Sequence, residues 1–354
     1  MSKRITIKDI AALAGVSLGS VHCALAGKAG VGENTRRRIL DIAKKHNYTP
    51  NAVAASLKRR TLNIGAAFPA PNEQNYGGFY YPFLWKGVRD CLRSQADFNI
   101  NLVELPYEKD TAGRDGEIAR LVRNGKLDGI VTVVYMDAFG KEPVAHFSGL
   151  GIPVALVGSD FPGSGRLCCV QPNYVVVGRT LAELVTNQIS EDGAVLIFAG
   201  HVGLASNYLT IAAFDAYMHE NSRFNPVYKI NYEAFGEEGR DRIRHELETR
   251  PEIAACIGIN ARGSVMLGQA LAASGRAGEV VAVGSDLFEE NIAFLRDGVF
   301  TNLLYKNPRR QAYLAARILA DHLARGINPA ESVAYVNSEI IFRSSLPMYP
   351  DGSF

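Results

Sequence analysis

Cysteine is scarce in this 354-residue sequence, and its spacing fits neither a metal site nor a disulfide framework. The five cysteines are an odd number, and none stands in a Cys-x-x-Cys pair. Such a set fits reduced core residues better than a network of disulfides. Cys168 and Cys169 are adjacent in a predicted strand, where one side chain faces each side of the sheet. Redox sensing through this pair or through Cys23 is the alternative interpretation.

Long apolar runs and targeting signals are also absent. No segment reaches the length of a transmembrane helix, and the N-terminus is charged and amphipathic, unlike the apolar core of a signal peptide. We therefore expect a cytoplasmic protein that has no membrane partner.

The common motifs of catalysis and cofactor binding are missing too. There is no G-x-G-x-x-G after a strand, no G-x-x-x-x-G-K-[ST] and no G-x-S-x-G. His245 and Glu246 are not followed by the second histidine of a zinc protease, and the glycine-rich stretch 158–165 reads as a loop between strands. The sequence favours a protein that is not an enzyme and that has no metal and no cofactor.

Charge is distributed unevenly along the chain. Residues 1–60 hold 12 Lys and Arg against three Asp and Glu, a net of +9, so the remaining 26 Lys and Arg and 33 Asp and Glu give −7. A basic segment of this kind suits phosphates, because Lys and Arg release the counterions of nucleic acid when they bind it. A solvated basic face is the alternative.

The basic segment has the pattern of a helix-turn-helix. Thr6 is a good N-cap and Asp9 answers it three residues later, so a helix begins here and ends at Gly15. Ser17 caps a second helix that runs to about residue 26.

A third helix completes a predicted three-helix bundle. It begins near Glu33 or Asn34 and ends at Asn47, before a proline. Ala11, Val16 and Val21 are expected to pack the angle between the first two helices.

The segments IKDIAALAGVS, VGENTRRRI, NYTPNAVAASL and LNIGAAF resemble, in order and spacing, the LacI/GalR transcriptional regulators. The resemblance implies a homodimer that places each second helix in the major groove of a double-stranded DNA operator, expected to be palindromic. It also implies a hinge helix, from Asn51 to about Arg59, whose Leu57 enters the central minor groove and kinks the duplex. A helix-packing role is the alternative for Leu57.

The expected DNA contacts lie in the predicted three-helix bundle, in the segment just after it and in the hinge. They are Thr6, Ile7, Ser17, Leu18, Gly19, His22, Cys23, Ala26, Thr35, Tyr48, Asn51, Val53, Ala54 and Leu57.

The second helix departs from the family pattern. Cys23 stands where the family has arginine, and Ala26 stands where it has asparagine; cysteine cannot grip guanine with two hydrogen bonds. Leu18 can touch thymine methyl groups, His22 can donate to a purine, and Gly19 permits only a close backbone approach. We therefore predict an operator unlike the common family consensus.

The rest of the chain alternates short β-branched runs with amphipathic segments, which predicts parallel sheets covered by helices on both faces. The expected fold is a small all-α helix-turn-helix head followed by an α/β core of two doubly wound parallel-sheet lobes. The resemblance implies that this core is similar to type I periplasmic binding proteins. The expected parts are residues 1–50 (head), 51–61 (hinge) and 62–354 (core), with lobes 62–170 plus 303–334 and 171–302 plus 335–354.

Ligands of such cores bind where the strand ends of the two lobes converge. The effector-binding residues expected there are Phe68, Tyr80, Tyr81, Phe83, Tyr135, Asp137, Asn207, Tyr208, Thr210, Asn260, Arg262, Asp286 and Lys306.

Asp286 matches the family position whose carboxylate accepts sugar hydroxyls, although a loop or helix-capping role is the alternative. Thr210 stands where the family has a sugar-clamping arginine, while Arg262 and Lys306 bring positive charge. A sugar phosphate, a sugar acid or another carboxylate is therefore one candidate effector, and a neutral carbohydrate stacked on the aromatic residues is the other.

These parts predict a transcriptional regulator, expected to be a repressor, whose operator affinity follows the occupancy of the cleft. The sequence does not fix whether the effector releases or strengthens DNA binding. The alternatives are a repressor whose cleft does not function and an enzyme fused to a DNA-binding head.

Overall fold

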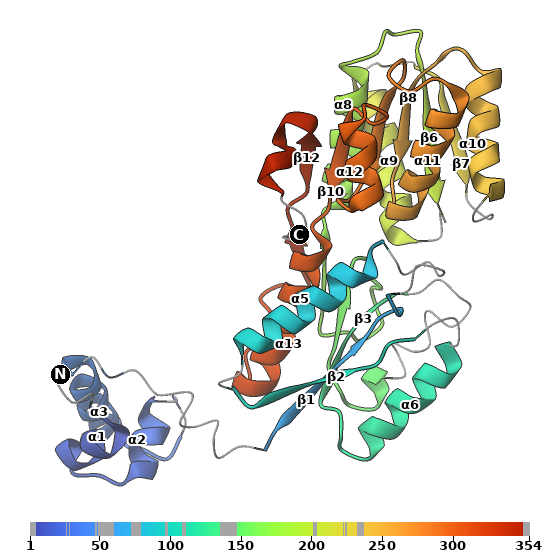
Figure 1. Cartoon of the computed structure of the whole chain (residues 1–354). Helices are drawn as coiled ribbons and strands as arrows, with labels where there is room; N and C mark the ends of the chain where they lie inside the picture. The colour runs from blue at the N-terminus through green and yellow to red at the C-terminus, as the bar shows by residue number, and fades with distance from the viewer. Residues whose placement is uncertain are drawn as a thin grey trace. The chain divides into compact units, whose positions relative to one another are not determined.

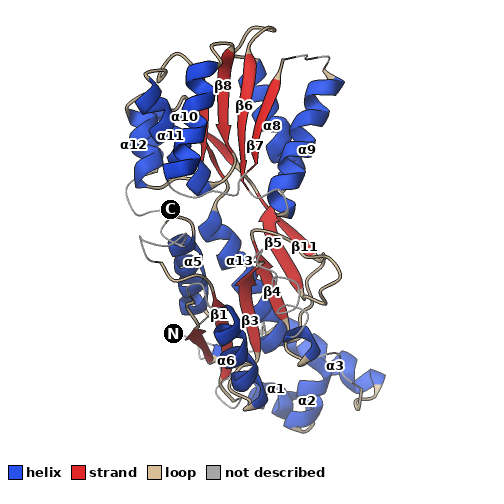
Figure 2. Cartoon of the chain, turned by 90° about the vertical axis from the view of Figure 1, so that its right-hand side faces the viewer, coloured by secondary structure: helices blue, strands red, loops and turns tan. Residues whose placement is uncertain are grey.

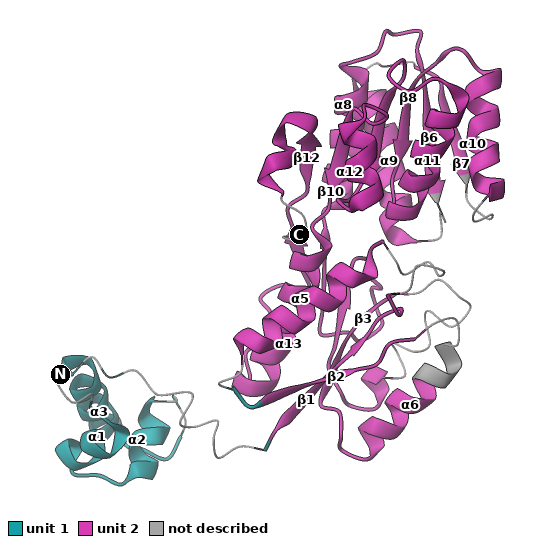
Figure 3. Cartoon of the chain, in the orientation of Figure 1, with its two compact units in different colours: residues 1–60, 97–99 teal, residues 61–96, 100–354 magenta. Residues whose placement is uncertain are grey.

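The structure is a computed structural model that divides into two compact units (Figures 1 and 3). It describes residues 5–25, 27, 29–46, 48, 60–71, 79–95, 98–107, 111–134, 147–200, 204–221, 223, 225–231 and 237–349. One unit contains residues 1–60 with 97–99, and the other contains residues 61–96 with 100–354.

The first unit holds a bundle of α1 (Ile7–Ala14), α2 (Leu18–Leu25) and α3 (Glu33–Lys45). The Thr6 side chain accepts from the Asp9 N–H, and the Asp9 carboxylate accepts from the Thr6 N–H at 2.8 Å, which confirms the predicted cap. Gly15 ends α1 with a left-handed φ of 62°, and α2 follows at a bend of 104°. Ile10, Val21 and Ile39 are completely buried between the three helices.

The second unit begins with a six-stranded sheet in which every pair of neighbours is parallel. Its order is β11-β5-β4-β3-β1-β2, formed by Val333–Val336, Cys168–Pro172, Val154–Val157, Gly129–Val133, Leu62–Ala67 and Ile100–Glu104. Helices α5 (Tyr81–Ser94) and α13 (Pro308–Arg325) cover one face and α6 (Thr111–Arg123) the other (Figure 2).

A second sheet has the order β12-β10-β9-β8-β6-β7. Its strands are Glu339–Phe342, Asn302–Tyr305, Val281–Ser285, Ile253–Gly258, Ala194–Gly200 and Val227–Asn231. Helices α8 (Tyr174–Thr186) and α9 (Ala205–Glu220) pack on one face, and α10 (Glu237–Thr249), α11 (Ala261–Ser274) and α12 (Glu289–Arg296) on the other. β12 runs antiparallel to β10 and leads into the 3-10 helix η2 (Arg343–Met348), so it departs from the all-parallel sheet that we predicted.

Burial on both faces explains the uniform apolar strands of the two lobes. β3, β4 and β9 consist almost wholly of buried residues, which is the pattern of parallel strands that are covered by helices on each side. Each sheet accordingly separates two apolar clusters, one under each helical layer.

The chain passes between the two sheets three times, after β5, after β10 and after β11. The strands before the three passages end at Pro172, Tyr305 and Val336, close to the approximate lobe boundaries expected at 170, 303 and 334. At the second passage, β10 completes the second sheet as far as Tyr305, and α13 begins only at Pro308, behind the cap that Asn307 forms.

Two helix pairs approach closely at glycines. A Cβ on Gly87 of α5 would lie 2.2 Å from the Arg309 carbonyl oxygen of α13, and one on Gly178 of α8 would lie 2.1 Å from the Thr210 carbonyl oxygen of α9. A side chain at either glycine would therefore force the helices apart.

No single helix in the described part of the chain is long and apolar enough to cross a membrane. Taken together, α1 and α2 pass the same test of length and composition, but the sharp bend separates them.

Candidate functional site

One face of α2 is open in the first unit. Val21 and Ala24 are buried against the bundle, whereas Leu18, Gly19 and His22 are exposed and Cys23 is half-buried. Ser17 accepts a hydrogen bond from the Ser20 N–H at 3.1 Å, so it caps α2 as predicted. The predicted reading residues that are described on α2 therefore share its outer side.

The other predicted DNA contacts of the head occupy different positions. Thr6 and Ser17 are exposed at the starts of α1 and α2, and Ile7 and Thr35 are half-buried. Tyr48 packs partly against the bundle core and donates its N–H to the Ala43 carbonyl at 2.8 Å. Ala26, Asn51, Val53, Ala54 and Leu57, with the predicted hinge helix, lie outside the described residues.

Asp286 lies directly after β9, in the second unit, with a left-handed φ of 68°. Only 1% of the residue is exposed. Its carboxylate accepts from the Lys306 N–H at 3.0 Å and from the Ser285 hydroxyl at 3.3 Å. The Asn291 amide donates to the Asp286 carbonyl at 3.0 Å, which fixes the turn from the other side.

Lys306 is an ion-pair partner of Asp286. Its Nζ lies 3.3 Å from Asp286 Oδ2 and donates to the Ile259 carbonyl at 3.0 Å, and the side chain is 10% exposed. Two residues that we expected to contact a ligand separately therefore form one buried pair whose charges compensate each other. Buried charges need such partners, because removal from water costs each ion several kcal/mol.

Two phenols lie where the lobes meet. Tyr80 donates to the Gln311 side-chain oxygen at 3.4 Å, and Tyr174 donates to the Gly158 carbonyl. Burial raises the pKa of both phenols well above the ordinary value, and Asp286 raises the pKa of each further through its negative charge. Because Gly158 follows β4 and Tyr174 begins α8, the second hydrogen bond joins the two lobes directly.

An aromatic contact also bridges the lobes. The ring centroids of Phe79 and Phe288 are 5.1 Å apart, and Phe83 packs with them against Ala261 and Val265. The sequence pointed to Tyr80 and Phe83 but missed Phe79 and Phe288. Their positions beside Tyr80 and just after the Asp286 turn are the signals that could have revealed them.

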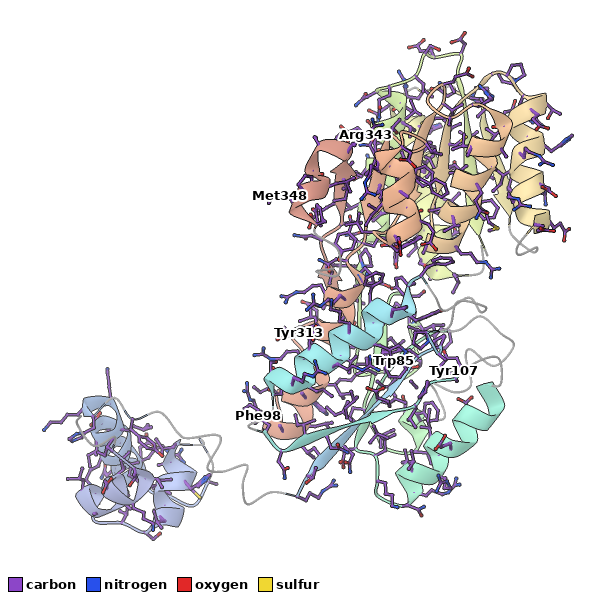
Figure 4. All side chains as sticks on the ribbon, in the orientation of Figure 1. Trp85, Phe98, Tyr107, Tyr313, Arg343 and Met348 are labelled. Atoms are coloured by element: carbon purple, nitrogen blue, oxygen red, sulfur yellow. The ribbon has the colours of Figure 1, made fainter. Side chains whose placement is uncertain are left out.

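Several predicted contacts have structural partners within their own lobe. Phe68 is fully buried and packs edge to face on Trp85, with the ring centroids 5.2 Å apart. Figure 4 labels Trp85 in this lobe. The Asn260 side chain caps α11 by accepting from the Gly263 N–H at 2.7 Å. Thr210 donates its hydroxyl to the Ser206 carbonyl at 2.8 Å.

The remaining predicted contacts differ in exposure. Tyr208 is 61% exposed on α9 and the neighbouring Asn207 is buried. Arg262 is half-buried at the start of α11, and Tyr81 packs edge to face on Tyr80 at 5.6 Å. Tyr135 and Asp137 lie outside the described residues.

The two cysteines of β5 do not resemble reactive thiols. Cys168 and Cys169 are fully buried in β5, and burial raises the pKa of Cys168 to about 12 and that of Cys169 further. Within the described ranges, no group of three or more His, Cys, Asp and Glu side chains is placed to hold a metal ion.

Comparison with known families divides the chain in the same way as its folding units. The family described as bacterial regulatory proteins, lacI family, matches residues 6–51, and the periplasmic binding protein domain matches residues 79–327. Catabolite control protein A from Streptococcus mutans is 31% identical over 157 residues, which are 44% of this chain and 44% of that protein. The match thus spans less than half of that relative's length.

Solved structures share the fold of the two lobes. A putative LacI transcriptional regulator from Bacteroides fragilis superposes with a TM-score of 0.72 at 20% identity, covering 82% of this chain and 100% of that one. A solute-binding protein from Burkholderia graminis, solved in complex with D-arabinose, gives a TM-score of 0.72 at 16% identity over 82% of this chain and 99% of its own.

Proposed function

This chain belongs to the lacI family of bacterial regulatory proteins and carries the family's periplasmic binding protein domain, and on that premise we propose that it is a transcriptional repressor controlled by a small molecule. It would act in the cytoplasm as a homodimer on a palindromic double-stranded DNA operator. Its task would be regulation rather than catalysis.

The observation that carries this proposal is the open face of α2 on a basic head. The bend of 104° between α1 and α2 is within the range of DNA-binding helix-turn-helix units, whose second helix enters the major groove. Residues 1–60 carry a net charge of +9, which supplies the attraction to phosphates. The predicted contacts at Leu18, Gly19 and His22 would then face the bases.

The effector would be a small neutral carbohydrate or a related compound that binds between the lobes. Lys306 is compensated by Asp286 at 3.3 Å, so it offers no uncompensated charge to an anion. Phe79 and Phe83 are only partly buried at the same junction, and sugar rings stack on such aromatic faces. The D-arabinose complex of the solute-binding protein gives a precedent for the fold.

Coupling would act through the three passages between the lobes. An effector shifts the balance of lobe arrangements only by its difference in affinity for them, and the head would respond to that shift. Operator affinities measured with and without the effector will show whether effector binding strengthens or weakens DNA binding.

Selection of sites from a random DNA pool, followed by affinity measurements with the full chain, tests the proposal. We expect a palindromic site whose affinity falls roughly a thousandfold or more between about 50 and 200 mM salt. D-arabinose and myo-inositol serve as neutral probes, and a sugar phosphate and a sugar acid serve as anionic ones. A pool that yields no enriched sequence would contradict DNA regulation, whereas a response to the anions alone would contradict the neutral effector.

A second candidate function is repression that needs no ligand. The contact between Phe79 and Phe288 already joins the lobes through side chains of the protein itself. In that case, operator affinity would be unchanged by every probe, and thermal unfolding of the core would not shift with any of them.

A further inference from the structure

The exposed face of α2 carries only two side chains that can reach far from the helix. Leu18 is 45% exposed, and His22 is exposed one turn later. Residues four apart lie on the same side of a helix, so the two side chains point the same way. Gly19 between them adds no side chain.

The chemistry of these two groups limits what they can recognise. Leucine has no hydrogen-bonding atom, so in a major groove it finds its complement in the methyl group of thymine. A neutral imidazole has one N–H donor, and the purine N7 atom is an acceptor in the major groove. Neighbouring Cys23 is half-buried and cannot form the two-hydrogen-bond contact of an arginine with guanine.

The spacing sets how far apart the two bases lie. Four residues of α-helix rise about 6 Å, and successive base pairs rise about 3.4 Å. A helix that runs along the groove therefore brings the two side chains to positions within about two base pairs of each other.

We propose that Leu18 and His22 together read a thymine methyl group and a purine N7 atom within about two base pairs in each half-site. This inference rests on the proposed function, because it assumes that α2 enters the major groove. It names a base specificity for α2, in which Cys23 stands where the family has arginine.

Gly19 supports this proposal because it has no side chain that would keep the backbone of α2 away from the bases. A Cβ there would lie 3.6 Å from the Ser17 hydroxyl, which is an ordinary contact, so alanine fits the folded head. If the backbone at Gly19 lies against the bases, Gly19→Ala will weaken DNA binding even though alanine favours the helix.

Base analogues in the selected operator test the proposal atom by atom. Replacing the thymine by deoxyuridine removes only the methyl group, and replacing the purine by its 7-deaza form removes only the N7 acceptor. For the unmodified chain we expect deoxyuridine to weaken binding about fourfold and the 7-deaza base about tenfold.

The matched variants are Leu18→Ala and His22→Ala. Leu18→Ala should bind thymine and deoxyuridine equally while it remains sensitive to the 7-deaza base, and His22→Ala should show the reverse. Circular dichroism and binding to non-specific DNA confirm that each head is folded. The proposed pair of contacts is wrong if the analogues weaken binding by the variants as much as binding by the unmodified chain, or if neither analogue changes binding at any position. Operator binding itself would stand in either case. If the unmodified chain selects no operator, the proposed function itself has failed.

Discussion

Asp286 and Lys306 form a buried ion pair, with Lys306 Nζ 3.3 Å from Asp286 Oδ2. Asp286 directly follows β9, and Lys306 directly follows β10. Their pairing at 3.3 Å depends on β9 and β10 being neighbours, a relation that no local pattern contains. Two separate ligand contacts in the sequence thus become one internal ion pair in the structure.

The pair makes a prediction about stability. Asp286→Asn keeps a residue type that tolerates the left-handed backbone but leaves the Lys306 charge buried without its counter-charge. We expect a loss of about 3 kcal/mol in the free energy of unfolding, measured in urea, because an uncompensated buried charge is costly. The double variant Asp286→Asn with Lys306→Gln removes both charges and should recover most of this loss. Equal losses in the single and double variants would show that the ion pair is not responsible.

At the scale of elements, local patterns predicted most of the fold. Helix ends in the head depend on neighbours within four residues. Examples are the cap formed by Thr6 and Asp9, the end of α1 at Gly15 and the start of α2 after Ser17. The apolar runs of β3, β4 and β9 are equally local, because these strands are buried on both faces. The antiparallel pairing of β12 with β10 was missed, since strand direction depends on how the chain returns to the sheet.

Helix packing at glycines gives a second prediction. Gly178→Ala should destabilise the core by about 2 to 3 kcal/mol, because its Cβ would meet the Thr210 carbonyl at 2.1 Å and the Ala213 side chain at 2.9 Å. Gly116→Ala on α6 is the matched control: no heavy atom lies within 4 Å of its Cβ, so helix propensity should stabilise the protein by up to about 1 kcal/mol. Chemical denaturation of both variants checks the opposite signs. A similar change in both would refute the close approach of α8 and α9.

At the scale of the whole molecule, the sequence predicted two lobes and their order but not how they touch. The contact of Phe79 with Phe288 joins residues from the two lobes, and the hydrogen bond from Tyr174 to Gly158 needs both sheets in place. The candidate ligand site was therefore predicted as a set of positions at strand ends. Its internal partners could be found only from the three-dimensional arrangement.

The buried phenols predict how stability responds to alkaline pH. The pKa values of Tyr80, Tyr174 and Tyr305 are raised above 10.0 in the folded state, chiefly by burial. The unfolded chain therefore loses these protons first, and the free energy of unfolding should fall as pH rises above about 10. Ultraviolet absorbance of phenolate should lag behind that of a denatured sample. Tyr174→Phe should reduce this lag, and a phenolate signal that matches the denatured sample throughout would contradict the burial of these groups.

The three passages between the sheets have a consequence for the order in which the protein is made. During synthesis from the N-terminus, the first sheet lacks α13 and its edge strand β11 until residue 336 has left the ribosome, and the second lacks β12 until residue 342 has. Neither lobe can be finished before residue 336 has been translated. The described helices of the head end at Lys45, so the head would mature long before either lobe.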